Sequence, residues 1–479
     1  MRTVPSLRLG NGMDLGAAAP PEPWVLPAHH LVTHGVIVGM TGSGKTGLVT
    51  VLVEEALHAK VPVLMIDVKG DLPDLLLAFP SFRPESFVPW VEEVLEPGDE
   101  RTPEQVAAEL AAERRSRLEA WGIGERELGD FHEKTAVRVI TPGSTAGEPL
   151  HVLSSLERRS PRWDTDPEAA RSALAAAVSL VLRLLGRDPD PARSREHVLL
   201  SVLAERRLHA GSPADIPSLL EDLAKPPIAR IGALPVDTYL PKSERRALAA
   251  ALNSLIASPT FESWRSGAPI DVEGWLRPVN ARAPAVIVSV AHLDDEERAL
   301  VLGVLLEELL AYTRSLPGSQ RLKALCVFDE VYGFLPPYPA NPPTKRPLVA
   351  LMKQARAFGV GVVLATQNPM DLDYRALGNA GIWFLGRLQT DADRARVVDG
   401  LGGKGAAPGA DLGNLLQHLQ PRWFVVRDVH ASNGLKLLQP RYAMSWLRGP
   451  MTRTELRMAR GASDVARAGA DWGKRPSFT

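Results

Sequence analysis

The sequence predicts an α/β fold around a parallel sheet, and three observations carry this prediction. Short apolar runs alternate with amphipathic helical stretches through most of the chain, which is the pattern of parallel strands joined by crossover helices. One run, residues 36–38, leads into a glycine-rich turn that ends in Lys45. Two later runs, residues 324–328 and 361–365, end in polar side chains, as strands do at the edge where such sheets bind ligands.

The glycine-rich turn has the G-x-x-x-x-G-K-[ST] pattern of a phosphate-binding loop. Its glycines let successive backbone N–H groups converge on phosphate oxygens, in conformations that a Cβ would obstruct. Lys45 reaches the β- and γ-phosphates of a nucleotide, and the Thr46 hydroxyl can ligate Mg²⁺. A chance match is disfavoured because the expected helix at 44–57 directs its positive end at the same anion. The residues predicted to bind the nucleotide are Gly39, Thr41, Gly42, Ser43, Gly44, Lys45, Thr46 and Gly47.

Two carboxylates follow the predicted strand Ala324–Phe328 directly. A phosphate loop needs such partners, with Asp329 holding the Mg²⁺ shell and Glu330 polarising the attacking water. Taken alone, the pair could simply cap the end of a strand. Lys45 upstream favours the catalytic interpretation.

The next predicted strand, 361–365, repeats this logic and ends in Thr366, Gln367 and Asn368. We expect Gln367 to sense the γ-phosphate or position the water, although a turn leading into a proline is the alternative. Arg356 lies on the helix expected between the two strands, and Arg387 follows a predicted strand at 382–385. Both are candidate arginine fingers, while arginines at such places are usually solvated or paired.

Several other polar groups have an ordinary interpretation beside a functional one. Asp67 and Asp71 end a predicted strand at 61–66 and could aid metal binding or only stabilise a turn. The proline-rich segment 336–346 ends in two cations and is a solvated connector or a nucleic-acid contact. The G-x-G-x-x-G match at 400–405 follows helical sequence and is weak. A histidine cluster lacks metal-binding partners and is expected to shape the approach to the first strand: His29, His30 and His34.

The whole chain is that of an ordinary globular protein, with 45% hydrophobic residues, 23% charged residues and a formal net charge of −1. Its 479 residues leave room for more than one structural unit. Cys326 is the only cysteine, which excludes disulfides and a cysteine-based zinc site within the chain. No signal-peptide pattern or membrane-spanning stretch is seen, so we expect a soluble, cytoplasmic protein.

Composition divides the chain into predicted segments. Proline, glycine and alanine dominate the start, while alanine, leucine, arginine and glutamate at helical spacing dominate the middle. The predicted segments are an extended N-terminal arm at 1–30, a first part of the ATPase core at 31–153, a helical insertion at 154–264, a second part of the core at 265–450 and a loose C-terminal tail at 451–479.

Taken in order, these motifs resemble the HerA/FtsK branch of P-loop ATPases, and the HerA-type ATP-binding proteins in particular. The resemblance rests on Gly-Met-Thr-Gly-Ser-Gly-Lys-Thr, on the strand end at Asp329-Glu330, and on Lys-Gln-Ala-Arg356-Ala-Phe-Gly leading to Thr-Gln367-Asn-Pro. It covers about residues 34–450. It implies a RecA-like core, a hexameric ring with bound ATP and Mg²⁺, and ATP-driven movement of double-stranded DNA through a central pore. It also implies Glu330 as catalytic base, Arg356 as a finger acting across the subunit interface, and a nuclease or other effector as partner.

The sequence departs from the family pattern in one place. HerA proteins of the end-resection type carry an N-terminal β-barrel, for which residues 1–28 are too short, and FtsK proteins carry membrane helices that we do not expect here. A ring-forming DNA translocase is therefore the leading hypothesis. The alternative is a nucleotide-switched scaffold that assembles and gates an effector without moving DNA. A small-molecule kinase with a helical lid is a weaker hypothesis, against which the Gln367 and Arg356 motifs speak.

Overall fold

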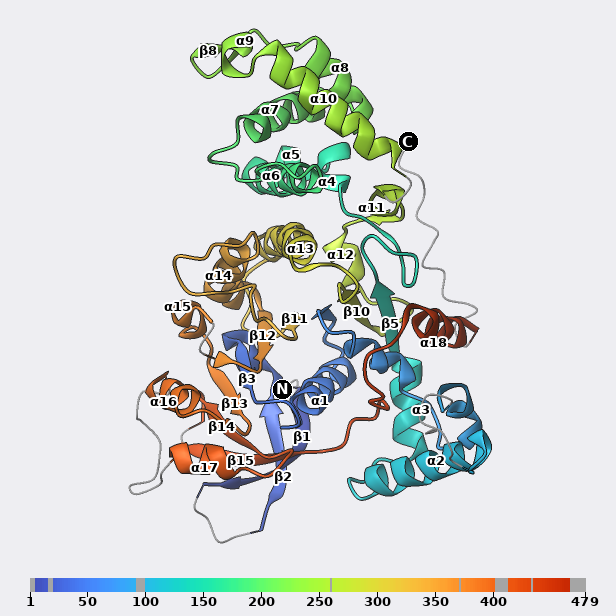
Figure 1. Ribbon diagram of the computed structural model, residues 1–479. Coiled ribbons are helices and arrows are strands. Elements are labelled where there is room, and N and C mark those ends of the chain that lie inside the picture. The colour runs from blue at the N-terminus through green and yellow to red at the C-terminus, as the bar shows by residue number, and fades with distance from the viewer. Residues whose placement is uncertain are drawn as a thin grey trace.

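The structure is a computed structural model whose centre is a large twisted sheet (Figure 1). It describes residues 5–15, 20–91, 100–258, 261–369, 372–400, 412–431 and 434–465. Within these residues the sheet has eleven strands in the order β2-β1-β15-β14-β13-β3-β12-β11-β4-β10-β5. Strands β13 through β5 in this order run parallel, and the other four pair antiparallel. The predicted fold class, a RecA-like P-loop core, is confirmed.

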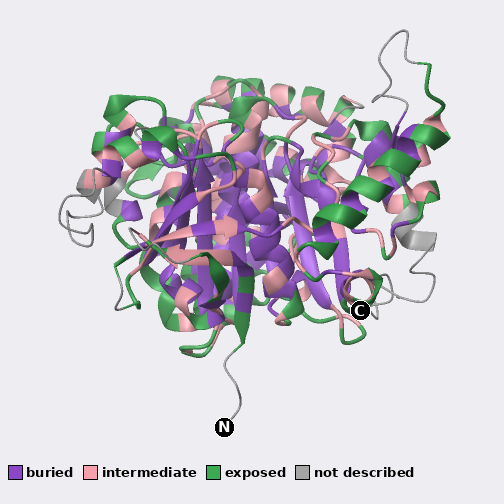
Figure 2. Cartoon of the chain, turned by 90° about the horizontal axis from the view of Figure 1, so that it is seen from below, coloured by how far each residue is buried: buried purple, intermediate pink, exposed green. Residues whose placement is uncertain are grey.

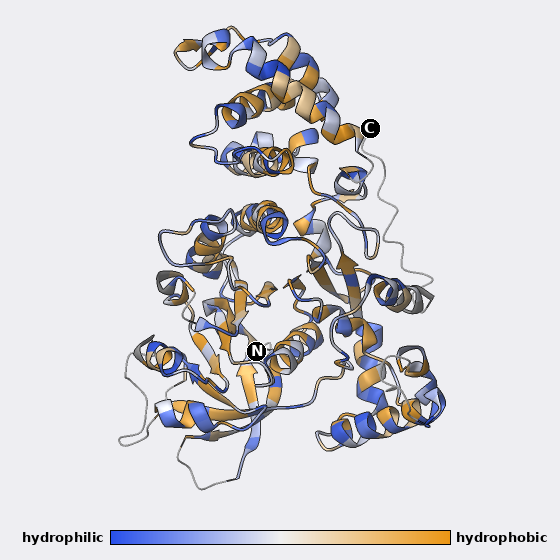
Figure 3. Cartoon of the chain, viewed as in Figure 1, coloured by the Kyte–Doolittle hydropathy of each residue, from blue (hydrophilic) through white to orange (hydrophobic). Residues whose placement is uncertain are grey.

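The seven parallel strands are short and almost entirely buried, because helices cover both faces of the sheet. Figure 2 shows them as a buried layer, and Figure 3 shows their apolar composition. Their continuous runs of Val, Ile, Leu and Ala are what made them predictable from the sequence. They are β3 (Gly35–Val38), β4 (Val63–Asp67), β5 (Thr135–Ile140), β10 (Ala283–Ser289), β11 (Ala324–Phe328), β12 (Val360–Thr366) and β13 (Ile382–Leu385).

Alternation of side chains along each strand separates two cores on the two faces of the sheet. In β3, Val36 and Val38 join the core beneath α13 (Asp295–Ser315) and α14 (Lys345–Gln354). Ile37 joins the core of the opposite face, together with Leu48 and Leu52 of α1 (Lys45–His58). α2 (Pro103–Glu119) and α3 (Glu125–Lys134) also contribute to this second core. The phosphate loop is therefore fixed between two packed layers.

The stretch 154–264 is helical, as its composition predicts, and its helices stack away from the sheet in Figure 1. It attaches to the core where α6 packs on α13. Glu308 of α13 accepts a hydrogen bond from Ser155 Oγ at 2.8 Å and pairs with Arg162. That residues 154–264 form a separate insertion stays a prediction. Its helices are α4 (Ser154–Glu157), α5 (Arg162–Thr165), α6 (Pro167–Leu184), α7 (Arg195–His209), α8 (Ile216–Ala224), α9 (Val236–Tyr239), α10 (Lys242–Ala257) and α11 (Glu262–Arg265).

The two ends of the chain differ from their predictions. The N-terminal arm is extended, but β1 (Ser6–Asp14) and β2 (Glu22–Pro27) pair as a hairpin that extends the sheet beyond β15 (Leu435–Pro440) and β14 (Phe424–Asp428). The tail was predicted to be loose, which is wrong for residues 453–465, where α18 (Arg453–Val465) forms.

The beginning of α18 explains why this part of the tail is ordered. Thr452 and Glu455 exchange backbone and side-chain hydrogen bonds as a capping pair. Leu456 and Ala459 are buried against the rest of the molecule. Residues 466–479 lie outside the described residues.

Candidate nucleotide-binding site

The glycine-rich loop connects β3 to α1 in the conformation that its sequence requires. Gly42 and Gly44 have positive φ angles of 77° and 91°, and Gly44 caps the N-terminus of α1. A Cβ on Gly39 would lie 2.4 Å from Ser43 Oγ. The loop is also held by its neighbours, because Gly39 N donates to the Thr366 carbonyl at 3.2 Å. The geometry is that of an anion cradle at a helix N-terminus.

Side chains from three strand ends meet above this loop. Lys45 Nζ, only 6% exposed, lies 2.6 Å from Glu330 Oε1, which follows β11. Gln367, which follows β12, donates from Nε2 to the same Glu330 oxygen. Thr41 Oγ1 of the loop donates to Gln367 Oε1 at 2.7 Å. We call this chain of contacts, Thr41–Gln367–Glu330–Lys45, the loop network. The structure thus brings together the predicted lysine, base and sensor.

The loop network borders a cavity of about 580 Å³. Glu330, Gln367 and Asn368 line it on one side, and Arg298 of α13 lines it on another. Glu330 has a positive φ of 52°, which is uncommon for a residue with a side chain. Such backbone strain persists where surrounding contacts fix the residue, and here Lys45 and Gln367 hold its carboxylate.

Asp329 lies beneath Glu330 and is 2% exposed. Burial raises the pKa of its carboxyl to about 6, against the lowering effect of the Lys45 charge. Glu330 N donates to Asp329 Oδ1 at 3.1 Å. Thr46 lies on the first turn of α1, as predicted, and Gly47 follows it.

The predicted Mg²⁺ ligands fit the chemistry of that ion. Asp329 and Thr46 offer a carboxylate and a hydroxyl, which are hard oxygen donors. In the part of the chain that the structure describes, no cluster of three or more His, Cys, Asp or Glu residues is suited to a metal ion. Mg²⁺ is normally held by one or two protein groups together with substrate phosphates and water, so a small donor set is what such a site requires.

The two arginine candidates lie at opposite ends of the parallel strands, Arg387 at the carboxyl ends and Arg356 at the amino ends. Arg387 follows β13, and its carbonyl accepts a hydrogen bond from Met40 N of the loop at 3.0 Å. Arg356 precedes β12 in a short 3-10 helix, Ala355–Phe358, and its side chain is exposed. Strand β12 has seven residues, which at ~3.3 Å each separate Arg356 from Gln367 by roughly 20 Å. Arg356 is therefore remote from the phosphate loop of its own chain.

Of the remaining sequence candidates, the two aspartates behave as turn residues. Asp67 is fully buried, and its Oδ1 accepts a hydrogen bond from Gly70 N at 2.8 Å, which holds the turn after β4. Desolvation raises the pKa of the Asp67 carboxyl. Asp71 pairs with Lys69 at 3.2 Å. In the proline-rich segment, Lys345 pairs with Asp373 at 3.3 Å, so its charge is balanced within the chain.

The histidines near the first strand are structural groups, and they lie at the amino ends of the parallel strands, where Arg356 also lies. His34 is buried, and its Nδ1 accepts a hydrogen bond from Val362 N at 3.1 Å. Burial lowers the pKa of His34 to about 4, so it is neutral at physiological pH. His30 lies 2.6 Å from Asp428 of β14. The G-x-G-x-x-G match at 400–405 lies almost wholly outside the described residues.

Sequence reasoning missed one element of the site, the contact of Arg422 with the phosphate loop. Arg422 N donates to the Ser43 carbonyl at 2.9 Å, and a Cβ on Gly44 would lie 2.9 Å from Arg422 Cγ. The close approach is a second reason for glycine at position 44. No local pattern marks Arg422, because it reaches the loop only through pairing of β14 and β15 in the sheet.

Comparison with known proteins identifies the first part of the core. A family model described as the central domain of the helicase HerA matches residues 25–121, a stretch that contains the phosphate loop. This match confirms the resemblance noted in the sequence. No curated protein sequence matches the chain. Among the helices that the structure describes, none has the length and apolarity needed to span a bilayer.

Two similar solved structures align with nearly the whole chain. VirB4 of Thermoanaerobacter pseudethanolicus is 13% identical, the alignment covers 91% of this chain and 96% of VirB4, and the TM-score is 0.50. The plasmid coupling protein TrwB in complex with ADP and Mg²⁺ is 12% identical over 89% of this chain and 88% of TrwB, with a TM-score of 0.45. At this identity the VirB4 likeness shows the shared fold.

Proposed function

Since residues 25–121 match the central domain of the helicase HerA, we propose that this chain hydrolyses ATP to move double-stranded DNA through a ring of its own copies. The observation that carries the hydrolytic part is the loop network, which joins Lys45, Glu330 and Gln367 at one edge of the sheet. The DNA substrate, the ring and a nuclease or other effector partner follow from the family resemblance.

The contacts of the loop network support one proposed role for each of its residues. The β- and γ-phosphates of ATP are stronger partners for Lys45 than one carboxylate, so their binding draws Lys45 Nζ away from Glu330. Glu330 then accepts a proton from the attacking water as general base. Gln367 donates to Glu330 and accepts from Thr41 of the loop, so it can report the presence of the γ-phosphate to the base.

The Mg²⁺ ion that ATPases of this kind require would be held by Asp329 and Thr46. When bound, Mg²⁺ neutralises charge on the phosphates. The raised pKa of Asp329 reflects the cost of burying its charge, a cost that a bound cation would offset. Asp329 Oδ1 also accepts the Glu330 backbone N–H, which supports a proposed metal ligand and a proposed base that act side by side.

Arg356 requires a second copy of the chain in order to act. It lies roughly 20 Å from its own catalytic edge by the length of β12, which exceeds the reach of an arginine side chain. An exposed arginine at the opposite edge can instead meet the nucleotide of a neighbouring copy, as arginine fingers do in trans. Arg387 lies beside its own phosphate loop and is proposed to act there.

Displacement of a third strand from double-stranded DNA tests the translocase directly. The unchanged chain with ATP should displace a triplex-forming strand, and Glu330→Gln should bind ATP without displacing it. A scaffold that is switched by nucleotide alone would show no displacement, while its effector response would survive in Glu330→Gln. A kinase would consume ATP only with a small-molecule acceptor. Absence of displacement by an assembled, ATP-hydrolysing ring would refute translocation.

A further inference from the structure

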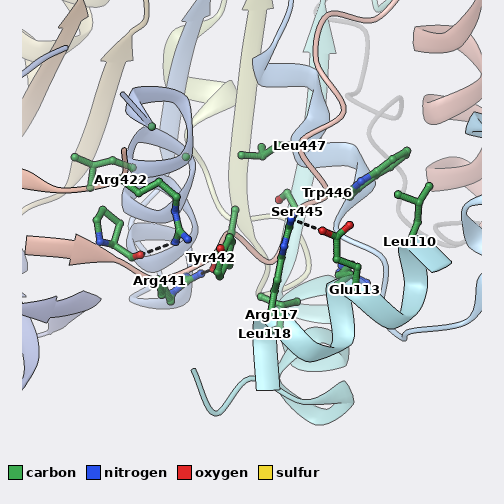
Figure 4. Close-up of a pocket in the computed structure, with 16 residues that line it drawn as sticks. Leu110, Glu113, Arg117, Leu118, Arg422, Arg441, Tyr442, Ser445, Trp446 and Leu447 are labelled. Atoms are coloured by element: carbon green, nitrogen blue, oxygen red, sulfur yellow. Dashed lines mark hydrogen bonds and ion pairs between the residues drawn. The ribbon is translucent and has the colours of Figure 1, made fainter. Parts of the chain in front are cut away.

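A second cavity, of about 260 Å³, is lined in part by the phosphate loop and by α1, and none of the four residues of the loop network lines it (Figure 4). Gly44, Gly47 and Leu48 of the loop and of α1 form one wall. Arg422 and Tyr442 form a second wall. This volume is slightly below the roughly 300–1,000 Å³ found for small-molecule sites, so it suits only a compact ligand or a part of one.

The second wall combines an aromatic ring with two guanidinium groups. The Arg422 guanidinium lies over the Tyr442 ring, 3.5 Å from its centroid, and Arg422 Nη2 donates to the Pro440 carbonyl at 2.8 Å. The Arg117 guanidinium of α2 lies 5.3 Å from the same centroid. Figure 4 shows Tyr442 between the two arginines. Arg117 is exposed and pairs with Glu113, whereas Arg422 is half-buried.

This wall is fixed to the helix that carries the phosphate loop. Arg441 is buried, and its guanidinium donates at 2.8 Å to Glu54 Oε2 and to Glu55 Oε1 of α1. Glu54 also accepts hydrogen bonds from Met444 N at 3.0 Å and from Ser445 N at 2.8 Å. Segment 441–445 therefore keeps its place relative to Lys45. A preorganised wall of this kind is a feature of binding sites.

We propose that this cavity binds the base and ribose of the nucleotide, with the base stacked on the Tyr442 ring in place of Arg117. The cavity shares Gly44 with the phosphate loop, so a nucleoside in it stays connected to phosphates held at Lys45. Leu110, Leu447 and Leu48 provide apolar surface at its edges. Such a mixture of aromatic, apolar and a few polar groups is typical of nucleoside recognition.

The displacement of Arg117 is energetically feasible. Its ion pair with Glu113 is exposed, and exposed pairs contribute little to stability. Stacking of a base on an aromatic ring contributes more than such a pair. Arg422 is held by its own backbone contact to the loop and by Pro440, so it stays as the backing of Tyr442. Exchange of the exposed Arg117 guanidinium for a base therefore leaves Tyr442 and Arg422 in place.

This proposal rests on the proposed function, and a comparison of ATP with inorganic tripolyphosphate separates the two. Both ligands reach the phosphate loop, but only ATP has a nucleoside. Calorimetric titration of Tyr442→Leu should show ATP binding weakened by about tenfold and tripolyphosphate binding unchanged. Tyr442→Phe keeps the ring and should bind ATP more tightly than Tyr442→Leu. Tyr239→Leu, on α9 in the helical stretch, is the matched control and should bind both ligands as the unchanged chain does.

Several other results would contradict either the nucleoside site or the proposed function. Unchanged ATP binding by Tyr442→Leu would overturn the nucleoside site, as would equal weakening of both ligands, which would make Tyr442 only a support of the loop. If Lys45→Ala still bound tripolyphosphate normally, the phosphate loop itself, and with it the proposed function, would fail. Photolabelling of the unchanged chain with 8-azido-ATP needs no variant. It should modify segment 110–118 or 440–447, and modification confined to other segments would contradict the site.

Discussion

Lys45 Nζ and Glu330 Oε1 lie 2.6 Å apart, so the phosphate-binding lysine and the candidate catalytic base are direct partners. Glu330 is also the acceptor for Gln367, which places the base between the loop and the sensor strand. The three groups come from the ends of β3, β12 and β11, which are neighbours in the sheet. Because Lys45 and Gln367 share this one carboxylate, we expect binding of phosphate at Lys45 to release Glu330.

The first prediction concerns Glu330→Gln. The amide keeps the size of the side chain but cannot accept the proton of water, so hydrolysis should fall by about 10²–10⁴-fold. ATP binding should persist, because Lys45 and the loop backbone are unchanged. A steady-state phosphate-release assay beside an ATP titration measures both. Glu273→Gln, an exposed glutamate paired with Arg277, is the control and should hydrolyse ATP normally.

The second prediction concerns the stability of Asp329→Asn. The folded protein holds the Asp329 proton more tightly than the unfolded chain, because burial raises the pKa from 3.8 to about 6. The ionised carboxylate therefore destabilises the fold above about pH 6, and this penalty fades as the pH falls towards 3.8. Asparagine removes the penalty, so the free energy of unfolding at pH 8 should rise by on the order of 3 kcal/mol, while Mg²⁺-dependent hydrolysis is lost.

Urea denaturation at pH 8 and at pH 5 checks this expectation. The advantage of Asp329→Asn over the unchanged chain should be large at pH 8 and smaller at pH 5. Asp295→Asn, whose side chain is exposed, should match the unchanged chain at both values. A lower stability of Asp329→Asn at pH 8 would show that the buried carboxylate is stabilised by its partners.

The third prediction concerns the two arginines at opposite edges of the sheet. Arg356→Ala and Lys45→Ala should each be inactive alone, and a mixture should regain part of the ATPase rate. At a mixed interface, a copy with intact Lys45 receives Arg356 from its neighbour. A mixture of Arg387→Ala with Lys45→Ala should stay inactive, because both residues serve the same phosphate loop. Recovery in the second mixture but not in the first would reverse the two assignments.

The fourth prediction concerns the buried cluster that joins α1 to the end of β15. Arg441→Met leaves Glu54, which is fully buried, without its cation. Loss of one partner of a buried pair costs about 3–5 kcal/mol. Arg115→Met removes exposed contacts with Glu119 and Glu125 and a cation–π contact with the Phe82 ring, and it should cost about 1 kcal/mol. Chemical denaturation of both variants compares them, and equal effects would contradict the structural role of Arg441.

The parts of the fold that the sequence predicts are those encoded by neighbouring residues. β3 with its loop, β11 with Asp329 and β12 with Gln367 each combine a buried run with a polar end, so the pattern is local. The antiparallel strands β1, β2 and β15 were not predicted. Their glycines, prolines and alternating exposure give no continuous apolar run, and only pairing with one another makes them strands.

In the candidate site, too, the residues marked by a local sequence pattern were the ones that could be predicted. Lys45, Glu330 and Gln367 are recognised by type and position, and their contact follows from parallel strands whose ends meet at one edge. The placement of Arg356 and Arg387 at opposite edges needed the strand order. Arg422 and Tyr442 could not be found from the sequence, since their relation to Gly44 depends on the edge strands and on the buried Arg441.

The most direct test of a DNA-driven ATPase is the rate of ATP hydrolysis by the assembled chain with and without linear double-stranded DNA. Our prediction is that DNA raises the rate of the unchanged chain and has no effect on Glu330→Gln, which stays near background in both conditions. A rate that no form of DNA changes, or a Glu330→Gln variant that hydrolyses ATP like the unchanged chain, would contradict it.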